Sequence, residues 1–266
     1  MSWSVDPGVQ AMQSGRFFGL NVVVTGGRGG IGAAIVSSFA QEGASVVSAD
    51  ISCEDEEPHN APGSPGVIER RLDVSDETSW KNMFEFVEAR FGALDVLVNN
   101  AGIYVPNIAF EDMPLDVWQR HFAINSDGTF LGCKHAILHM KERGRGAIVN
   151  IGSGMSITAN PNGAAYSASK AAALMTTRTA ARAAGRYGIT VNAVLPGAVQ
   201  TTMLMGNLQD EETENDFLRR MESFSPLGRL ASSLDIARAV LFLADPANRA
   251  ISGVHLPVDG GNIPGA

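Results

Sequence analysis

Apolar runs and helical apolar spacings alternate along most of the chain. LNVVVTGG (20–27) predicts a buried strand, GIGAAIVSSFAQEG (30–43) a helix that ends at glycine, and ASVVSAD (44–50) a second strand. The same patterns predict further strands at 67–74, 94–102, 146–153, 189–197 and 253–261, and helices at 76–92, 114–144, 164–187 and 233–245. Short apolar strands separated by helices are typical of parallel sheets with both faces covered. The chain is therefore expected to form an α/β fold around a mostly parallel seven-stranded sheet.

Two polar segments interrupt this alternation, and the chain starts with a third. CEDEEPHNAPGSPG (53–66) is rich in Pro and Gly and predicts a loop. The acidic run DEETEND (210–216), within a polar segment at 206–228, predicts a solvent-exposed helix start. Residues 1–18 have no strand or helix pattern and are expected to form a flexible extension. Because no internal linker is visible, residues 19–266 are expected to form a single domain.

Composition narrows the classes of partner. The 266 residues are 45% hydrophobic and 18% charged, which is typical of a compact globular protein. The net charge is −8 and there is no run of Lys or Arg, so nucleic acid is not an expected partner. No segment approaches 18 continuous apolar residues, and the N-terminus lacks the basic start and apolar run of a signal peptide. The chain is thus expected neither to span a membrane nor to be exported by that route. Two cysteines and five histidines show no metal-ligand spacing, and a reducing cytoplasm is the expected location.

The segment TGGRGGIG (25–32) connects the first predicted strand to the first predicted helix. Glycines at this place permit a tight turn and let backbone N–H groups approach a pyrophosphate at the positive end of the helix. Asp50 ends the second strand, where a carboxylate can accept hydrogen bonds from an adenosine ribose diol. Together these features predict a doubly wound, Rossmann-like dinucleotide-binding fold.

The stretch YSASK (166–170) places Tyr166 and Lys170 four residues apart in an alanine-rich run. On a helix these positions lie on one face about one turn apart, so a phenol and an ammonium would share one space. One interpretation is an acid/base device. The other is structural, with the tyrosine ring packed in the core and the lysine extending to water.

The ordered motifs decide between these interpretations. From about Gly19 onward the sequence resembles the short-chain dehydrogenase/reductase family. The shared motifs are Thr25-Gly26 with Gly30 and Gly32, Asp73-Val74, NNAG (99–102), Asn125, Ser153, Tyr166 with Lys170, Pro196-Gly197 with Thr201, and VDGG (258–261). The resemblance implies hydride transfer between a nicotinamide cofactor and an alcohol or ketone.

The resemblance also implies roles for four catalytic residues. Hydride transfer leaves a proton to be moved, and Tyr166 is the group that would move it, with Ser153 bonded to the substrate oxygen. Lys170 would favour the phenolate by its charge and contact the nicotinamide ribose. The backbone carbonyl of Asn125 would hold a water that links Lys170 to solvent. Asn125 stands beside Ser126, Asp127 and Gly128, which are poor helix formers, so a local distortion of the helix is predicted.

Cofactor contacts are carried over in the same way. Asp73 would bond the adenine amino group, Asn99 and Gly102 would line the ribose side, and Thr201 would hold the carboxamide. The full expected set is Gly26, Arg28, Gly30, Ile31, Gly32, Asp50, Asp73, Val74, Asn99, Ala101, Gly102, Tyr166, Lys170, Pro196, Gly197, Val199 and Thr201. A carboxylate at position 50 repels a 2′-phosphate and favours NAD(H), whereas Arg28 argues weakly for NADP(H).

The loops expected near the cofactor carry apolar side chains at Ile103, Tyr104, Met155, Ile157, Met203, Leu204, Met205 and Leu208. Ser153, Met155, Tyr166 and Met203 are expected to contact the substrate, and a hydrophobic secondary alcohol or ketone, alicyclic or steroid-like, would suit this lining. Two alternatives stay open: an NADPH-dependent 3-oxoacyl thioester reductase of the same family, and a dinucleotide-binding sensor or scaffold without turnover.

Assembly is the last expectation from the sequence. The alanine-rich helix at 164–187 permits close helix packing, and the helix before it carries Phe122, Phe130, Leu131 and Ile137. Relatives pair these two helices across a twofold axis, so a homotetramer is expected.

Overall fold

The computed structural model describes residues 15–53, 59–60, 66–158, 160–208 and 211–263. Within these ranges one sheet has the strand order β3-β4-β2-β1-β5-β6-β7-β8. All its strands run parallel except β3, which pairs antiparallel with β4. The bounds are β1 Asn21–Thr25, β2 Ser45–Asp50, β3 His59–Asn60, β4 Val67–Arg71, β5 Val96–Asn99, β6 Gly146–Ile151, β7 Ile189–Pro196 and β8 His255–Val258.

The seven predicted strands and their parallel arrangement are confirmed. Strand β3 is the difference, because it lies in the segment that the sequence predicted as a loop. It has two residues, which is too short to show an alternating pattern. Only its pairing with the edge strand β4 makes it a strand.

Both faces of the sheet are buried, and successive side chains of a strand enter different cores. Val22 and Val24 of β1 join one core with residues of α2 (Gly30–Gln41) and α9 (Ser233–Ala244). Val23, between them, joins the other core with residues of α3 (Glu77–Phe91) and α5 (Gly128–Met140). Successive side chains point to opposite faces, and both faces are buried, so every position of the strand must be apolar. The strands are therefore continuous apolar runs in the sequence rather than alternating ones.

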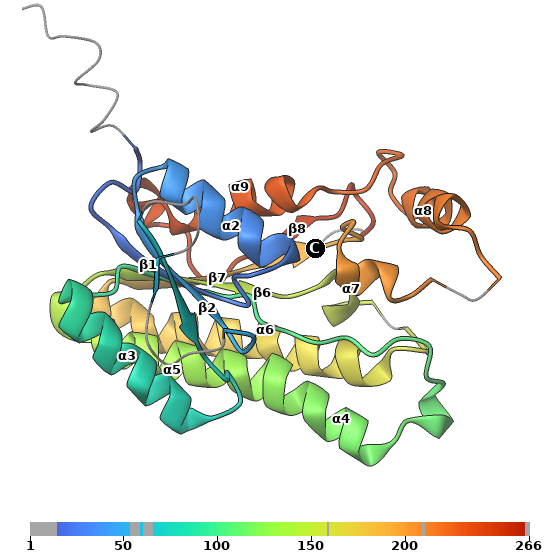
Figure 1. Cartoon of the computed structure of the whole chain (residues 1–266), viewed down its shortest axis with the longest axis horizontal. Helices are drawn as coiled ribbons and strands as arrows, with labels where there is room; N and C mark the ends of the chain where they lie inside the picture. Colours follow the sequence, from blue (N-terminus) through green and yellow to red (C-terminus); the bar gives the residue numbers. More distant parts are fainter. Residues whose placement is uncertain (1–14, 54–58, 61–65, 159, 209–210, 264–266) are drawn as a thin grey trace, which may run out of the picture.

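Helices cover the sheet on both sides, as Figure 1 shows. Helices α2 and α9 lie together on one side, and α3, α5 and α6 (Ala164–Ala184) lie on the other. Two short helices follow the end of β7, namely α7 (Thr202–Met205) and α8 (Glu214–Ser223). The 3₁₀ turns are η1 Phe110–Asp112, η3 Lys141–Arg143, η4 Gly154–Ser156, η5 Gly185–Tyr187 and η6 Pro246–Asn248.

The helical stretch predicted at 114–144 is divided. Helix α4 (Leu115–His121) continues into a π-helical segment, η2 (Phe122–Asp127), before α5 begins. The predicted distortion at Asn125 is therefore confirmed. Its wider turn rotates Asn125 inward, where the residue is completely buried.

The ordered fold begins earlier than the sequence indicated. Residues 1–14 lie outside the described residues, but Phe17 is fully buried and meets Phe39 edge to face at a centroid distance of 4.7 Å. Beside it, the Arg16 guanidinium donates to Glu42 Oε1 at 2.7 Å. The expected boundary at residue 19 was therefore wrong for residues 16–18, because one aromatic contact with α2 is invisible in a local pattern.

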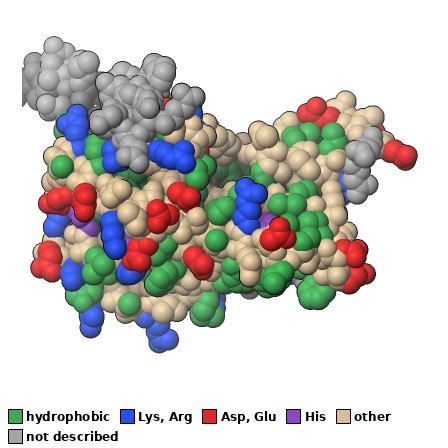
Figure 2. Space-filling model, turned by 60° about the horizontal axis from the view of Figure 1, so that its bottom comes forward, with side chains coloured by type: hydrophobic (Ala, Val, Ile, Leu, Met, Phe, Trp, Pro, Cys, Tyr) green, Lys and Arg blue, Asp and Glu red, His purple; other side chains and the backbone are tan. Residues whose placement is uncertain are grey.

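Charged side chains are intermixed over the surface. Figure 2 shows Lys and Arg scattered among Asp and Glu, with hydrophobic side chains between them, on the face that it draws. No described helix is long and apolar enough to cross a membrane.

Candidate active site

The strand order reverses beside β1, whose neighbours are β2 and β5. Loops that leave adjacent strands toward opposite faces open a crevice at the carboxyl ends of the strands, and ligands of open α/β sheets bind there. The loop from β1 enters this crevice as a glycine turn, with φ of 62° at Gly26 and 52° at Gly30. Gly32 packs on the Gly26 carbonyl so tightly that a Cβ atom would collide with it. Among the described residues no side chain caps α2. The first N–H groups of this helix therefore remain available to bind an anion.

Asn100 holds this glycine turn against the end of β5. Its side-chain amide donates to the Thr25 and Gly26 carbonyls at 2.9 and 3.0 Å, and Thr25 Oγ1 accepts from the backbone N–H groups of Asn100 and Ala101 at 3.0 Å each. The sequence analysis missed Asn100. A polar residue at the strand end beside the glycine loop was the available signal.

Asn99, which the sequence analysis placed at the ribose, has its side chain elsewhere. It is 5% exposed, and its amide donates to Asn150 Oδ1 at 2.8 Å inside the core. Successive strand residues point to opposite faces, so Asn99 and Asn100 cannot both face the glycine turn. A cofactor contact by the Asn99 backbone stays a prediction.

Asp50 and Arg28 meet at the outer end of the crevice. Asp50 accepts from the Ser52 N–H at 3.0 Å, from Ser52 Oγ at 2.8 Å and from the Arg28 N–H at 3.3 Å. The Arg28 guanidinium donates to the Ser52 carbonyl at 2.9 Å and lies 3.7 Å from Glu69 Oε1. The two residues that argued for different cofactors therefore share one hydrogen-bonded loop.

Other expected cofactor residues come from several further elements. Thr201 caps the start of α7, and its methyl group would touch a Cβ atom at Gly30. A Cβ atom at Gly102 would lie 3.2 Å from Lys170 Nζ, which places the β5 loop beside the lysine. The remaining expected residues occupy the first turn of α2 (Ile31), the loop after β4 (Asp73, Val74), the end of β7 (Pro196) and the segment after it (Gly197, Val199).

Tyr166 and Lys170 lie on one face of α6, as predicted. Lys170 Nζ is 5.9 Å from the centroid of the Tyr166 ring and donates to the Ile151 carbonyl at 2.8 Å. The lysine is only 4% exposed, and burial lowers its pKa to about 8. The charge is thus held at the end of β6, next to the tyrosine.

Opposing influences act on the pKa of Tyr166. Burial raises the pKa of Tyr166 to about 12, a hydrogen bond with Ser153 acts to lower it, and Tyr104 raises it further. Ser153 is held in place by a capping box, in which its N–H donates to Ser156 Oγ at 3.1 Å and its Oγ accepts from the Met155 N–H at 3.2 Å. Without a cofactor the phenol is therefore protonated at neutral pH.

Asn125 connects the β5 loop to α6. Its side chain exchanges two hydrogen bonds with the Ile103 backbone, at 2.9 and 3.0 Å, and donates to Ser169 Oγ at 3.0 Å. Its backbone carbonyl accepts from Thr129 Oγ1 at 2.7 Å. A carbonyl has a second lone pair, so the water-mediated link to Lys170 stays a prediction.

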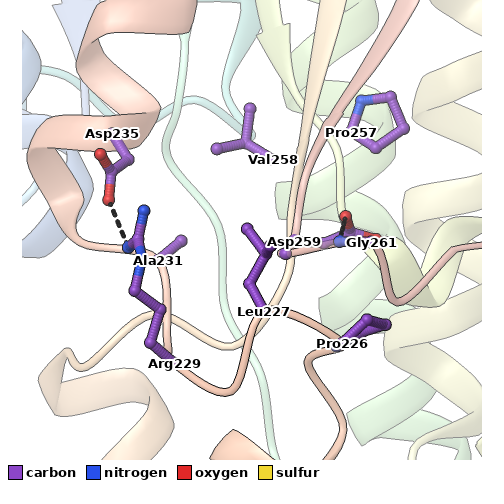
Figure 3. Close-up of a pocket in the computed structure, with 10 residues that line it drawn as sticks. Pro226, Leu227, Arg229, Ala231, Asp235, Pro257, Val258, Asp259 and Gly261 are labelled. Atoms are coloured by element: carbon purple, nitrogen blue, oxygen red, sulfur yellow. Dashed lines mark hydrogen bonds and ion pairs between the residues drawn. The ribbon is translucent and has the colours of Figure 1, made fainter.

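Two expected substrate contacts lie on short helical elements. Met155 follows Ser153 in η4, and Met203 lies on α7 with 43% of its surface exposed. A cavity of about 580 Å³ lies elsewhere, between the start of α9 and the end of β8 (Figure 3). Arg229 and Asp235 are paired at its wall at 3.2 Å, and none of the expected catalytic residues lines it.

Comparison with known proteins agrees with this geometry. A family model described as enoyl-(acyl carrier protein) reductase matches residues 26–262. A cis-4-hydroxycyclohexanecarboxylate dehydrogenase of Sinomonas cyclohexanicum is 38% identical over 241 residues, which cover 90% of this chain and 94% of that protein. The chain belongs to the short-chain dehydrogenase/reductase family. It is an oxidoreductase that acts on CH–OH groups with a nicotinamide dinucleotide.

Solved structures of this family have the same fold. Levodione reductase superposes with a TM-score of 0.86 at 30% identity, over 94% of this chain and all of that chain (100%). The structure described as ElxO with NADP bound gives a TM-score of 0.84 at 32% identity, over 91% of this chain and 98% of that one. The predicted family and fold are confirmed.

The crevice has the features that a nicotinamide dinucleotide requires. The contact between Gly26 and Gly32 forms a cradle that a Cβ atom would fill, and the uncapped start of α2 faces it. In the described ranges, no cluster of three or more His, Cys, Asp or Glu side chains could hold a metal ion.

Proposed function

We propose that this short-chain dehydrogenase/reductase interconverts a hydrophobic, cyclic secondary alcohol and its ketone with NAD(H), and that Tyr166 is the general acid/base. The observation that carries the proposal is the convergence of Ser153, Tyr166 and Lys170 from β6 and α6 at one end of the crevice. The bound nicotinamide ring supplies or accepts the hydride. The protein's own residues must therefore move one proton and stabilise one oxygen.

In ketone reduction, Tyr166 donates its proton to the carbonyl oxygen as negative charge develops there. The Ser153 hydroxyl donates a second hydrogen bond to the same oxygen. In alcohol oxidation the phenolate of Tyr166 accepts the proton, and the positive charge of Lys170 favours that phenolate. The buried Asn125 holds the Ile103 backbone beside this group.

A cyclic substrate is favoured by two observations. The side chains expected beside Tyr166 are apolar, among them Met155 and Met203. The relative from Sinomonas cyclohexanicum is named for a hydroxycyclohexane substrate. A turnover screen of alicyclic and open-chain secondary alcohols and ketones and of 3-oxoacyl thioesters, each with NAD(H) and NADP(H), tests the proposal. Turnover only of 3-oxoacyl thioesters with NADPH would replace it with the reductase alternative, and turnover of no substrate would favour a binding role.

NAD(H) is the proposed cofactor because of the loop around Asp50. A 2′-phosphate would meet the Asp50 carboxylate, whereas a free ribose diol can donate to it. Arg28 argues less for NADP(H) than its charge indicates, since its guanidinium is already bonded to the Ser52 carbonyl and near Glu69.

Replacing Asp50 should change cofactor preference. In Asp50→Ala the loss of charge-assisted hydrogen bonds worth about 1.5–3 kcal/mol should lower kcat/KM for NAD by about 10- to 150-fold. The kcat/KM for NADP should fall less or rise, because repulsion of the phosphate is relieved. Asp50→Asn is the matched variant that keeps the shape and removes the charge. A wild-type enzyme that already prefers NADP(H) would show the cofactor assignment to be wrong.

A homotetramer and a cytoplasmic location are also proposed. Of the helix residues expected at an interface, Phe130 is 53% exposed, but Leu131 is 8% exposed and packs in the core, so that expectation was wrong for Leu131. Leu138 on α5 and Met175 on α6 are 50% and 58% exposed and extend the apolar surface. Both cysteines are free and buried, which suits a reducing compartment.

Charge placed on this surface should separate the subunits. Sedimentation of the wild type at micromolar concentration is expected to give a tetramer, and Phe130→Asp with Met175→Asp a smaller species, because buried carboxylates oppose association. The matched control is Phe110→Asp, at a residue 70% exposed on η1. A monomeric wild type would contradict the proposal.

A further inference from the structure

Tyr104 packs against the proposed catalytic tyrosine. The centroids of the Tyr104 and Tyr166 rings are 4.6 Å apart, with 40° between the ring planes. Both side chains are partly exposed, so the pair lies at the surface of the crevice rather than deep in the core. Stacked and tilted aromatic pairs at this distance stabilise each other beyond simple burial.

The backbone on both sides of Tyr104 is held by completely buried side chains. Asn125 exchanges two hydrogen bonds with Ile103, at 2.9 and 3.0 Å. His121 Nε2 accepts from the Val105 N–H at 3.2 Å, while its Nδ1 lies 2.8 Å from the Val117 carbonyl. Because a backbone N–H can only donate, Nε2 is the acceptor in the contact with Val105, which leaves Nδ1 to donate to the Val117 carbonyl. Tyr104 therefore extends from a segment that is fixed before substrate binds.

The far end of the Tyr104 side chain fits a space made by Gly163. A Cβ atom at Gly163 would lie 3.0 Å from the Tyr104 hydroxyl oxygen and 3.0 Å from Met155 Cε. The residue just before α6 thus has no side chain where Tyr104 and Met155 meet. Asn160 Nδ2 lies 3.5 Å from the Tyr104 hydroxyl oxygen, a weak contact that leaves this hydroxyl without a strong partner among the described residues.

We propose that Tyr104 is a positioning residue for proton transfer: its ring holds the Tyr166 phenol in one orientation and limits the access of water to it. The inference rests on the proposed role of Tyr166. The ring, rather than the hydroxyl, performs this function, because among the described residues Tyr104 contacts Tyr166 ring to ring. Tyr104 also acts to raise the pKa of Tyr166 through the electrostatic interaction of the two phenols, which is separate from the ring contact.

The test compares Tyr104→Phe with Tyr104→Ala on one responsive secondary alcohol. Tyr104→Phe keeps the ring and should retain kcat within about threefold, whereas Tyr104→Ala should lose about 10- to 100-fold, since small errors of position have effects of this size. Oxidation requires the phenolate, so kcat rises with pH through the pKa of Tyr166 in the complex. Better hydration of Tyr166 in Tyr104→Ala lowers that pKa. The rise of kcat with pH should therefore occur at lower pH than in the wild type.

Three further measurements keep the test decisive. Phe110→Ala, in the same connecting segment and 70% exposed, should behave as wild type. Tyr104→Leu retains apolar bulk and replaces Tyr104→Ala if that variant does not fold. It lacks the ring that packs on Tyr166 and should also lose kcat, with a smaller shift of the pH profile because its bulk still excludes water. Tyr166→Phe on the same substrate separates the two proposals, because full turnover there refutes the proposed function itself.

The inference is overturned by either of two results. One is a folded Tyr104→Ala or Tyr104→Leu enzyme with wild-type kcat and an unmoved pH profile while Tyr166→Phe is inactive. The other is a Tyr104→Phe enzyme that loses as much kcat as Tyr104→Ala, because the hydroxyl would then be the functional group. A Tyr104→Ala or Tyr104→Leu enzyme with a lower melting temperature but unchanged kcat and pH profile would also overturn the inference.

Discussion

Tyr166→Phe should lower turnover by about 10² to 10⁴, the usual contribution of a positioned acid/base group, and leave folding and cofactor binding intact. The substitution keeps the ring and its contact with Tyr104 and removes only the hydroxyl that Ser153 contacts. Loss of proton transfer lowers kcat and kcat/KM together, while the Kd for NAD(H) stays near the wild-type value. The measurements are kcat and KM for one responsive alcohol, cofactor titration and melting temperature.

Tyr187→Phe is the matched control, since it removes a phenol hydroxyl in η5, after the end of α6. It should be fully active. If Tyr166 served only packing, Tyr166→Phe would change melting temperature more than turnover. A Tyr166→Phe enzyme that keeps most of its turnover would refute the mechanism.

Lys170→Met should abolish most activity and yet stabilise the cofactor-free protein at neutral pH. Turnover falls because the charge that favours the Tyr166 phenolate is gone, and cofactor affinity falls if Lys170 contacts the ribose as proposed. Folding must place the ammonium where it is 4% exposed, and its pKa drops from 10.5 to about 8. That shift corresponds to about 3 kcal/mol against the folded state. Leaving the Ile151 carbonyl unbonded costs about 1–2 kcal/mol, so the net gain in free energy of unfolding is about 1–2 kcal/mol.

The sign of the pH dependence follows from the lowered pKa. Below pH 8 the lysine is charged in both folded and unfolded states, and its full cost is present. As pH rises from 8 to 10.5, the folded state loses the proton first and the cost disappears. The difference in unfolding free energy between Lys170→Met and wild type should therefore shrink over this window.

Urea unfolding of the cofactor-free proteins at pH 7 and pH 10 measures this difference. Lys134→Met is the control: its lysine is 41% exposed and paired with Glu77, so its effect should be small. A Lys170→Met protein that is less stable than wild type at pH 7, or a difference that grows with pH, would contradict the expectation.

Several features of this protein follow from local sequence patterns. The seven parallel strands were predicted because strands buried on both faces must be apolar at nearly every position, as in β1 and β5. The pairing of Tyr166 with Lys170 followed from the helical period alone. A local distortion at Asn125 was predicted from three consecutive poor helix formers, and the structure shows it as a π-helical turn. In each case the cause lies within a few residues along the chain.

Other features depend on residues that are far apart in the sequence. Asn100 rather than Asn99 holds the glycine turn because the pleat of β5 directs their side chains to opposite faces once β1 lies alongside. In the sequence, Arg28 argued for NADP(H). In the fold, Ser52 after β2 and Glu69 on β4 lie beside its guanidinium, so its charge is a weaker argument for a 2′-phosphate.

The sequence by itself determined the family, the order of the elements and the chemical groups at the site, because these depend on local period and on motif order. Only the tertiary structure decided which groups touch. Tyr104 is 62 residues from Tyr166 in the chain, and its ring reaches the Tyr166 ring only because Asn125 and His121 hold its segment against α6. Contacts of this kind depend on packing between elements, which no local pattern records.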